Sequence, residues 1–184
     1  MARRTDTRDP RSARLAALRV LHEADVRGED PLVALERRVA AEAPAERLRA
    51  TGAADDPELG DVRVDAFARS LVEGVAATRD DLDARIARHA RGWKVGRMPV
   101  VDRNLLRLAV HELMTEPTPV AVVLDEAVRL AKELSTDDSG RYVNGVLVAV
   151  VKELGRTLDA GDAGDAGDAG VTGVAGTSGE DADR

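Results

Sequence analysis

The sequence has no cysteine and very few aromatic residues, and each absence excludes a class of site. Without cysteine, the chain forms neither a disulfide framework nor a thiolate metal site. Aromatic residues make up only 2% of the chain, and they are Phe67, Trp93 and Tyr142. Three such residues are too few for a sheet that reads RNA by stacking several bases on aromatic side chains.

Long apolar runs are also missing, although 43% of the 184 residues are hydrophobic. A membrane-spanning helix needs a run of about 20 apolar residues. The composition therefore predicts a soluble protein with one sizeable core or two small ones, and no membrane partner. The lack of cysteine is compatible with a reducing compartment, so we expect a cytoplasmic protein.

Motifs of common enzymes do not occur in the sequence. It contains no Gly-x-Ser-x-Gly elbow, no P-loop and no Gly-x-Gly-x-x-Gly after a strand. The three histidines, His22, His89 and His111, fall in separate predicted helices without metal-ligand spacing, and Asp137 and Asp138 alone are a poor ligand set. We therefore expect a binding module rather than an enzyme, with no cofactor and no metal.

Charge is distributed unevenly along the chain, whose formal net charge is −7. Residues 1–19 hold six arginines against two aspartates, whereas residues 159–184 hold seven acids against one arginine. Arginine outnumbers lysine by 24 to 3, which fits either a biased genome composition or a need for guanidinium chemistry. The chain is polarised, with a basic head and an acidic tail.

The composition divides the chain into three parts. Residues 1–10 are expected to be a flexible basic arm, and residues 11–158 a helical domain with a mobile loop near residues 42–60, where two prolines and two glycines cluster. Residues 159–184 begin with four Asp-Ala-Gly triplets and lack aliphatic periodicity. This last part is predicted to be disordered.

Apolar residues at helical spacing predict seven helices and no strand. The helices are expected at about 11–26, 31–39, 61–75, 78–92, 101–113, 120–134 and 143–154. Gly28 is expected to end the first, Asp30 and Pro31 to open the second, Asp61 to precede the third, and Thr78 to start the fourth. The segment Val146–Val151 has the β-branched composition of a buried strand, but its spacing favours a helix. An all-α bundle follows.

Arginines at the start of the first predicted helix are candidate phosphate ligands. A guanidinium binds phosphate bidentately and also stacks on a base. Arg11 and Arg14 fall on the same side of the helix as Leu15 and Leu18, so they reach solvent only if the packed part begins after them. We expect them to project beyond the edge of the bundle. The alternative is a solvated terminus without a ligand.

The turn before the last predicted helix is a second candidate site. Asp138 or Ser139 is placed to cap that helix, whose free N–H groups also favour a phosphate, and Tyr142 offers an aromatic surface for a base. The alternative is simple capping with Tyr142 half-buried. Gly145 lies inside the helix, where glycine costs about 1 kcal/mol relative to alanine. A close approach by another helix or by a ligand would explain it.

Three segments in this order resemble the NusB family of bacterial transcription antitermination factors. They are Arg11–His22, Val101–Leu113, and Leu124–Lys132 followed by Asp138–Leu147. With Trp93 and the segment Leu71–Val75, the resemblance covers about residues 11–154. It implies an all-helical fold of two subdomains that binds the boxA element of ribosomal RNA leader transcripts as a single strand, together with the ribosomal protein NusE. The two join an RNA polymerase antitermination complex, and no reaction is catalysed.

The resemblance also implies roles for individual residues. The implied RNA contacts are Arg11, Arg14, Asp138, Ser139, Arg141 and Tyr142. The implied NusE contacts are His22 and Asp102. The family often has tyrosine at the position of His22, phenylalanine at that of Tyr142, and a denser arginine run around Arg11.

Two further classes stay open at this point. A purely protein-binding helical adaptor would bind NusE or the polymerase without affinity for RNA. An RNA-targeting subunit of a separate rRNA-modifying enzyme is the other, because NusB-like domains also precede RNA methyltransferase domains. The apolar helices are equally compatible with a homodimer, which would cover the RNA surface.

Overall fold

The computed structural model describes residues 9–50, 63–115 and 117–157, and these ranges contain six α-helices, one short 3-10 helix and no strand. The all-α prediction is confirmed. The elements are α1 (Pro10–Arg27), α2 (Pro31–Ala50), α3 (Ala66–His89), η1 (Val95–Arg97), α4 (Val100–Thr115), α5 (Val120–Leu134) and α6 (Ser139–Glu153). Most of the predicted basic arm and the whole predicted acidic tail lie outside the described residues.

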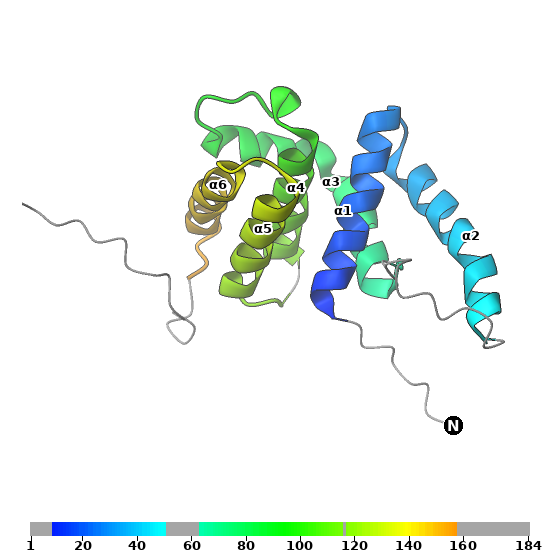
Figure 1. Ribbon diagram of the computed structural model, residues 1–184. Helices are drawn as coiled ribbons and strands as arrows, with labels where there is room; N and C mark the ends of the chain where they lie inside the picture. The colour runs from blue at the N-terminus through cyan, green and yellow to red at the C-terminus, as the bar shows by residue number, and fades with distance from the viewer. Residues whose placement is uncertain (1–8, 51–62, 116, 158–184) are drawn as a thin grey trace, which may run out of the picture.

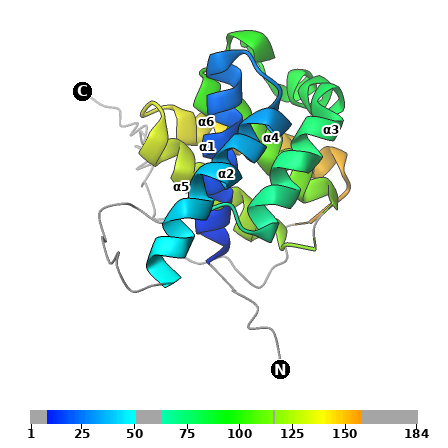
Figure 2. The same ribbon diagram turned by 90° about the vertical axis from the view of Figure 1, so that its right-hand side faces the viewer.

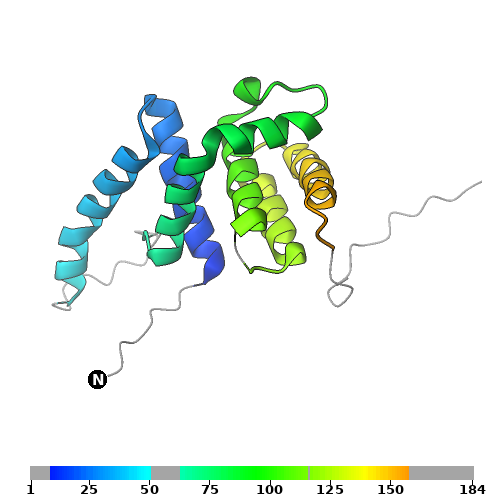
Figure 3. The ribbon, with the colours of Figure 1, turned by 180° about the vertical axis from the view of Figure 1, so that it is seen from behind.

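The helices form two groups that share α3 (Figure 1). In the first group α2 lies across α1, as Figure 2 shows, and both contact α3. The second group consists of α4, α5 and α6, which contact one another, and α3 contacts α4 and α6 as well. Seen from behind in Figure 3, α3 runs from the first group to the second. The buried apolar side chains of both groups form one continuous core.

A kink divides α3 into two segments. The backbone of Thr78 leaves the helical region, with φ −120° and ψ 17°, and its hydroxyl donates to the carbonyl oxygen of Gly74 at 2.8 Å. The side chain thus bonds a carbonyl of the preceding turn instead of capping a new helix. The sequence predicts a break at this residue, and the kink lies there; because the two segments are joined across it as one element, the described residues hold six helices rather than seven.

Local hydrogen bonds fix most helix ends as the sequence predicts. Gly28 ends α1 in the left-handed region, with φ 65°, which glycine adopts without steric cost. The carboxylate of Asp30 accepts from the backbone N–H of Leu32 at 2.7 Å, at the start of α2. The carboxylate of Asp65 accepts from the N–H of Ala68 at 2.7 Å. Asp65 therefore caps α3, and Asp61 lies outside the described residues.

The predicted mobile loop is wrong over its first part. Helix α2 continues to Ala50 through Pro44, so residues 42–50 are helical. Alanine, arginine and glutamate dominate this stretch, and their helix propensity prevails over the single proline. Residues 51–60 lie outside the described part of the chain.

Close packing between α3 and α4 depends on one glycine. A Cβ atom at Gly74 would lie 2.0 Å from Nε2 of His111, which is buried on α4. Any larger residue at this position would push the imidazole aside and separate the two helices. Gly74 therefore fixes the distance between α3 and α4 in the centre of the protein.

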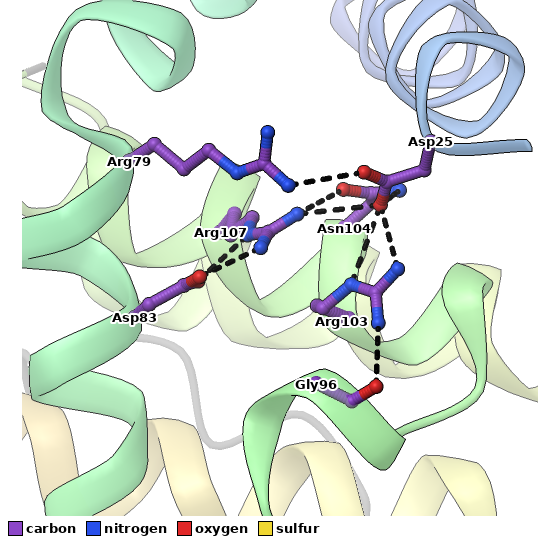
Figure 4. A network of polar contacts seen from close by, with 7 residues as sticks. All are labelled: Asp25, Arg79, Asp83, Gly96, Arg103, Asn104 and Arg107. Carbon is purple, nitrogen blue, oxygen red and sulfur yellow. Dashed lines mark hydrogen bonds and ion pairs between the residues drawn. The ribbon is translucent and has the colours of Figure 1, made fainter. Parts of the chain in front are cut away.

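A polar network joins α1, α3 and α4 where the two groups meet (Figure 4). One carboxylate oxygen of Asp25 accepts from Arg103 at 2.9 Å, from Asn104 at 3.0 Å and from Arg107 at 3.3 Å. Arg107 also donates to both carboxylate oxygens of Asp83 on α3 at 2.7 Å. We call this set, together with Arg79, the Asp25 network.

The carboxylate of Asp25 is ionised in this network. Burial alone would raise its pKa, but the hydrogen bonds from Arg103 and Asn104 and the charge of Arg107 together hold the pKa below its ordinary value. Arg79 on α3 adds a contact of 3.3 Å to the second oxygen. The network is a fully paired junction between the two groups of helices.

Candidate nucleic-acid interface

A pocket of about 360 Å³ lies at the start of α6, beside the chain that leads into α4. It is lined by Trp93, Pro99, Asp102, Thr136, Asp138, Ser139 and Tyr142. Four of the residues that the sequence singles out meet here, although Asp102 is more than 30 positions from the others in the sequence. We call this hollow the α6 pocket.

Ser139 holds the wall of the α6 pocket together. Its side chain is buried, and the hydroxyl donates to Oδ2 of Asp102 at 2.8 Å. The hydroxyl oxygen of Ser139 in turn accepts from the backbone N–H of Thr136 at 3.2 Å. These bonds join the α5–α6 turn to the first turn of α4 and fix the orientation of the Asp102 carboxylate.

Asp138 occupies the N-cap position of α6, but its side chain makes no capping hydrogen bond. Its backbone has helical angles, φ −85° and ψ −14°, rather than the extended angles that direct a side chain toward the free N–H groups. The sequence offered Asp138 or Ser139 as the cap; Asp138 does not cap the helix, and the Ser139 hydroxyl bonds Thr136 and Asp102 instead. Its exposed carboxylate remains at the rim of the pocket.

Two polar atoms of residues that line the α6 pocket are buried and have no hydrogen-bond partner among the described residues. They are Oδ1 of Asp102 and the hydroxyl oxygen of Tyr142. Burial and the nearby charge of Asp102 raise the pKa of Tyr142, so the hydroxyl stays protonated at neutral pH. Because buried polar groups are usually bonded, the pair fits a ligand that offers both an N–H group and an acceptor.

Two of the three aromatic side chains meet at this pocket. The ring centroids of Trp93 and Tyr142 are 6.4 Å apart, and the ring planes are inclined by 57°. The Trp93 side chain is 50% exposed, so its ring is accessible to a planar ligand. The sequence analysis did not predict Trp93 as a ligand contact. Its rarity could have pointed to one, because Trp93 is one of only three aromatic residues in the chain.

The charges of the α6 pocket decide which part of a nucleotide fits it. The carboxylates of Asp102 and Asp138 repel a phosphate group. A carboxylate oxygen accepts well from the amino group of a base, as Asp and Glu do from cytosine N4. The pocket is therefore suited to the uncharged, N–H-bearing edge of a base.

Arg14 does not project into solvent. It is 7% exposed, its Nε donates to Oε2 of the buried Glu112 at 2.9 Å, and a second guanidinium nitrogen donates to Oε1. The guanidinium carbon also lies 5.6 Å from the centre of the Phe67 ring. Because α1 already begins at Pro10, Arg14 falls on the packed face of the helix, and the expectation that it extends beyond the bundle is wrong. An RNA contact by Arg14 stays a prediction.

Arg11 lies one turn earlier and is paired at the surface. Its guanidinium donates to Glu126 at 3.0 Å and to Glu133 at 2.7 Å, both on α5. The side chain is 26% exposed, so a phosphate can compete with the two carboxylates for the same donors. Its role in RNA binding also stays a prediction.

The remaining predicted residues lie apart from one another. Arg141 is exposed on α6 and does not line the α6 pocket. His22 is half-buried on α1, and no hydrogen bond or ion pair joins it to Asp102 within the described ranges. Asp102 is 3% exposed, so a partner reaches its carboxylate only through the pocket.

The described part of the chain has neither a membrane-spanning helix nor a cluster of metal ligands. None of its helices is both long and apolar enough to span a membrane. Its His, Asp and Glu side chains nowhere gather in threes as metal ligands would. His89 instead contacts Glu153, and His111 packs on Gly74.

Comparison with protein families gives a match to the model of the NusB family over residues 11–152. A transcription antitermination protein NusB from Saccharopolyspora erythraea is 46% identical over 137 residues, which are 73% of this chain and 81% of the relative. One from Acidothermus cellulolyticus is 48% identical over 139 residues, which are 75% and 83% of the two chains.

Two solved structures share the fold. NusB from T. maritima superposes with a TM-score of 0.63 and 33% identity, covering 79% of this chain and 92% of that one. A structure of the antitermination factors NusB and NusE in complex with double-stranded RNA gives a TM-score of 0.59 and 27% identity, covering 78% and 96% of the two chains.

Proposed function

The chain belongs to the NusB family, and on that premise we propose that it is a transcription antitermination factor. It binds boxA-type single-stranded RNA of ribosomal leader transcripts together with the ribosomal protein NusE. It thereby supports processive transcription by RNA polymerase, as a cytoplasmic regulatory protein and not as an enzyme.

The observation that carries this proposal is the α6 pocket. A flipped-out base enters it with its amino group toward Oδ1 of Asp102, while the Tyr142 hydroxyl donates to a neighbouring acceptor on the base. The rings of Trp93 and Tyr142 contact the face of the base. Asp138 at the rim accepts from a second base or from a ribose hydroxyl.

Partner binding is proposed for a different face. A solved relative of 27% identity was crystallised with NusE and RNA, which supports the same pairing for this chain. His22 lies on α1, and Val26, four residues later on the same side of the helix, is 66% exposed. We assign NusE binding to this face of α1. The resemblance implies a NusE contact for Asp102 as well, but we assign Asp102 to RNA binding because its buried side chain lines the α6 pocket. If each partner raises the affinity for the other, the coupling is reciprocal.

The test is a titration of fluorescein-labelled boxA-type RNA followed by fluorescence anisotropy, with and without NusE. We expect binding that NusE strengthens, and a loss of about tenfold or more for Tyr142→Ala, since stacking on one aromatic side chain contributes on the order of 1–3 kcal/mol. Binding of NusE without any RNA affinity would support the adaptor alternative instead.

A matched pair of acidic variants refines the test. Asp138→Asn removes an acceptor at the rim of the α6 pocket, whereas Asp137→Asn changes a neighbouring exposed acid that does not line it. We expect Asp138→Asn to change the preference between boxA-type RNA and a scrambled strand, and Asp137→Asn to leave it unchanged. An equal response of the two variants would remove Asp138 from base recognition.

A further inference from the structure

A second hollow lies on the other side of Tyr142, between the end of α3 and the exposed face of α6. Its volume is about 410 Å³, and its lining includes Arg88, His89, Arg91, Arg141, Tyr142 and Gly145. We call it the arginine notch. Tyr142 lines both hollows, so the α6 pocket and the arginine notch are adjacent.

The arginine notch carries more positive charge than the neighbouring carboxylate of Glu153 neutralises. Glu153 accepts from Arg88 at 2.6 Å and from Arg85 at 2.7 Å, and it contacts His89 at 2.6 Å. The hydrogen bond from Arg88 and the contact with His89 lower the pKa of Glu153 to about 2, so this carboxylate is ionised at neutral pH. Asp81 pairs with Arg85, and its charge also acts on Arg88.

Two arginines of the notch have no carboxylate. Neither Arg91 nor Arg141 makes an ion pair or a side-chain hydrogen bond within the described residues, and both side chains are exposed. Most other arginines of the described chain are paired with carboxylates. Two unpaired guanidinium groups beside one hollow, in a chain of net charge −7, indicate an anionic ligand.

Gly145 supports the same conclusion. It lies in the interior of α6, where glycine is among the least favourable residues. A Cβ atom at Gly145 would meet no atom within 4 Å, whereas one at Gly140 would collide with the side chain of Lys132. No helix packs against Gly145, so it does not serve a close helix contact. Its absent side chain leaves the wall of the notch open for a ligand.

We propose that the arginine notch binds the phosphodiester backbone of the RNA strand whose base enters the α6 pocket. The inference rests on the proposed function and extends it by a second subsite. Carboxylates lie on one side of Tyr142 and guanidinium groups on the other. A nucleotide has the matching polarity, because its base offers N–H groups and its phosphate is anionic. Arg91, Arg141 and the bare helix at Gly145 therefore direct the strand across α6 toward the end of α3.

The first test replaces a cation that the proposed function does not use. In the presence of NusE, Arg91→Gln should lower the affinity for boxA-type RNA about threefold or more, and should reduce the slope of log affinity against log salt by about 0.7. Arg69→Gln is the control. It removes the same charge, but from the part of α3 where Arg69 pairs with Glu36 on α2. The control should leave both quantities unchanged.

The second test uses Gly145→Ala. Alanine favours the helix and meets no neighbour, so the unfolding midpoint should stay the same or rise. The added methyl group stands in the notch, so the affinity for RNA should fall. A variant that is at least as stable but binds RNA less well separates a ligand surface from a structural role.

The third test removes single phosphate charges from the RNA by methylphosphonate linkages placed one at a time along the strand. In the wild type at least one linkage should weaken binding, and in Arg91→Gln that linkage should have no further effect. Equal losses in both proteins at every position would overturn the inference, since Arg91 would then act only through overall charge.

The outcomes distinguish the two proposals. If the wild type with NusE ignores boxA-type RNA, the proposed function fails and the notch has no role in it. If Tyr142→Ala abolishes RNA binding while Arg91→Gln and Gly145→Ala bind as the wild type does, the proposed function stands and the arginine notch is not an RNA subsite.

Discussion

Arginines occupy two contrasting surroundings in this protein, the Asp25 network and the arginine notch. In the network, Arg103 and Arg107 are held by Asp25, and Arg107 is held by Asp83 as well (Figure 4). In the notch, Arg91 and Arg141 have no carboxylate partner among the described residues. Arginine therefore joins helices through ion pairs in one region and is accessible to a ligand in the other.

The difference shows that the pairing of an arginine is more informative than its place in the sequence. With 24 arginines in 184 residues, an arginine-rich segment alone is a weak sign of a binding site. Arg14 illustrates this, because it lies in the basic head and is nevertheless buried against Glu112. Each of the following experiments acts on one side of this contrast.

The largest effect is expected for Asp25→Ala. The substitution leaves Arg103, Asn104 and Arg107 without their shared acceptor at a half-buried junction, and it should lower the free energy of unfolding by about 3 kcal/mol. Urea denaturation measures this as a lower midpoint with an unchanged slope. Arg91→Gln serves as the comparison and should leave the midpoint unchanged. Equal stability of Asp25→Ala and the wild type would contradict a stabilising role for the Asp25 network.

Arg14→Ala should destabilise the protein by about 2–3 kcal/mol, because it leaves the buried Glu112 carboxylate without its partner. Arg11→Ala, one turn earlier, removes only partly exposed ion pairs and should cost less than about 1 kcal/mol. The two variants should rank in the opposite order in RNA titrations.

The slope of log affinity against log salt should fall by about 0.7 for Arg11→Ala, and it should not change for Arg14→Ala. A changed slope for a folded Arg14→Ala would show that Arg14 contacts a phosphate, as the family resemblance implies.

A smaller effect is expected from acid. The pKa of Asp25 is below its ordinary value of 3.8 in the folded protein, so its contribution to stability is complete above that value and is lost as the pH falls toward the folded pKa. Thermal unfolding from pH 6 to pH 2 should therefore show a steeper loss of stability below about pH 4 in the wild type than in Asp25→Asn. Parallel curves for the two proteins would show that Asp25 does not titrate with unfolding.

The smallest effect is expected from the acidic C-terminal segment. Residues 159–184 carry seven acids and one arginine, and unpaired arginines attract carboxylates as well as phosphates. Ending the chain at Leu158 should raise the affinity for RNA about threefold at low salt, and this gain should vanish at high salt. The unfolding midpoint should not change. The same affinity for both chains at low salt would dismiss competition by this segment.

Much of the fold was predictable because it depends on local patterns. Apolar spacing located α4, α5 and α6, and Gly28 and Asp30 marked the turn between α1 and α2. The break at Thr78 was predicted at the right residue, but its form was not, because the Thr78 hydroxyl bonds back to the carbonyl oxygen of Gly74 instead of capping a new helix. The length of α2 was underestimated because proline and glycine were given more weight than the helix formers around them.

The candidate site was only partly predictable. Asp138, Ser139 and Tyr142 were found from the turn and from the family resemblance. Their combination with Asp102 and Trp93 depends on how α4 packs on α6, which no local pattern contains. The burial of Arg14 also depends on a distant residue, since Glu112 is 98 positions away. Only one feature of the local sequence pointed to the arginine notch, and it is Gly145 in the middle of the apolar helix α6.

The kinked helix α3 has a consequence for folding. Its first half completes the contacts of α1 and α2, and its second half reaches α6 through Glu153, so neither half of the chain holds all the partners that it needs. We therefore expect a single cooperative transition in which both halves are gained or lost together. Cutting the chain near Thr78 should yield two fragments that stay unfolded alone and regain helicity only when they are mixed.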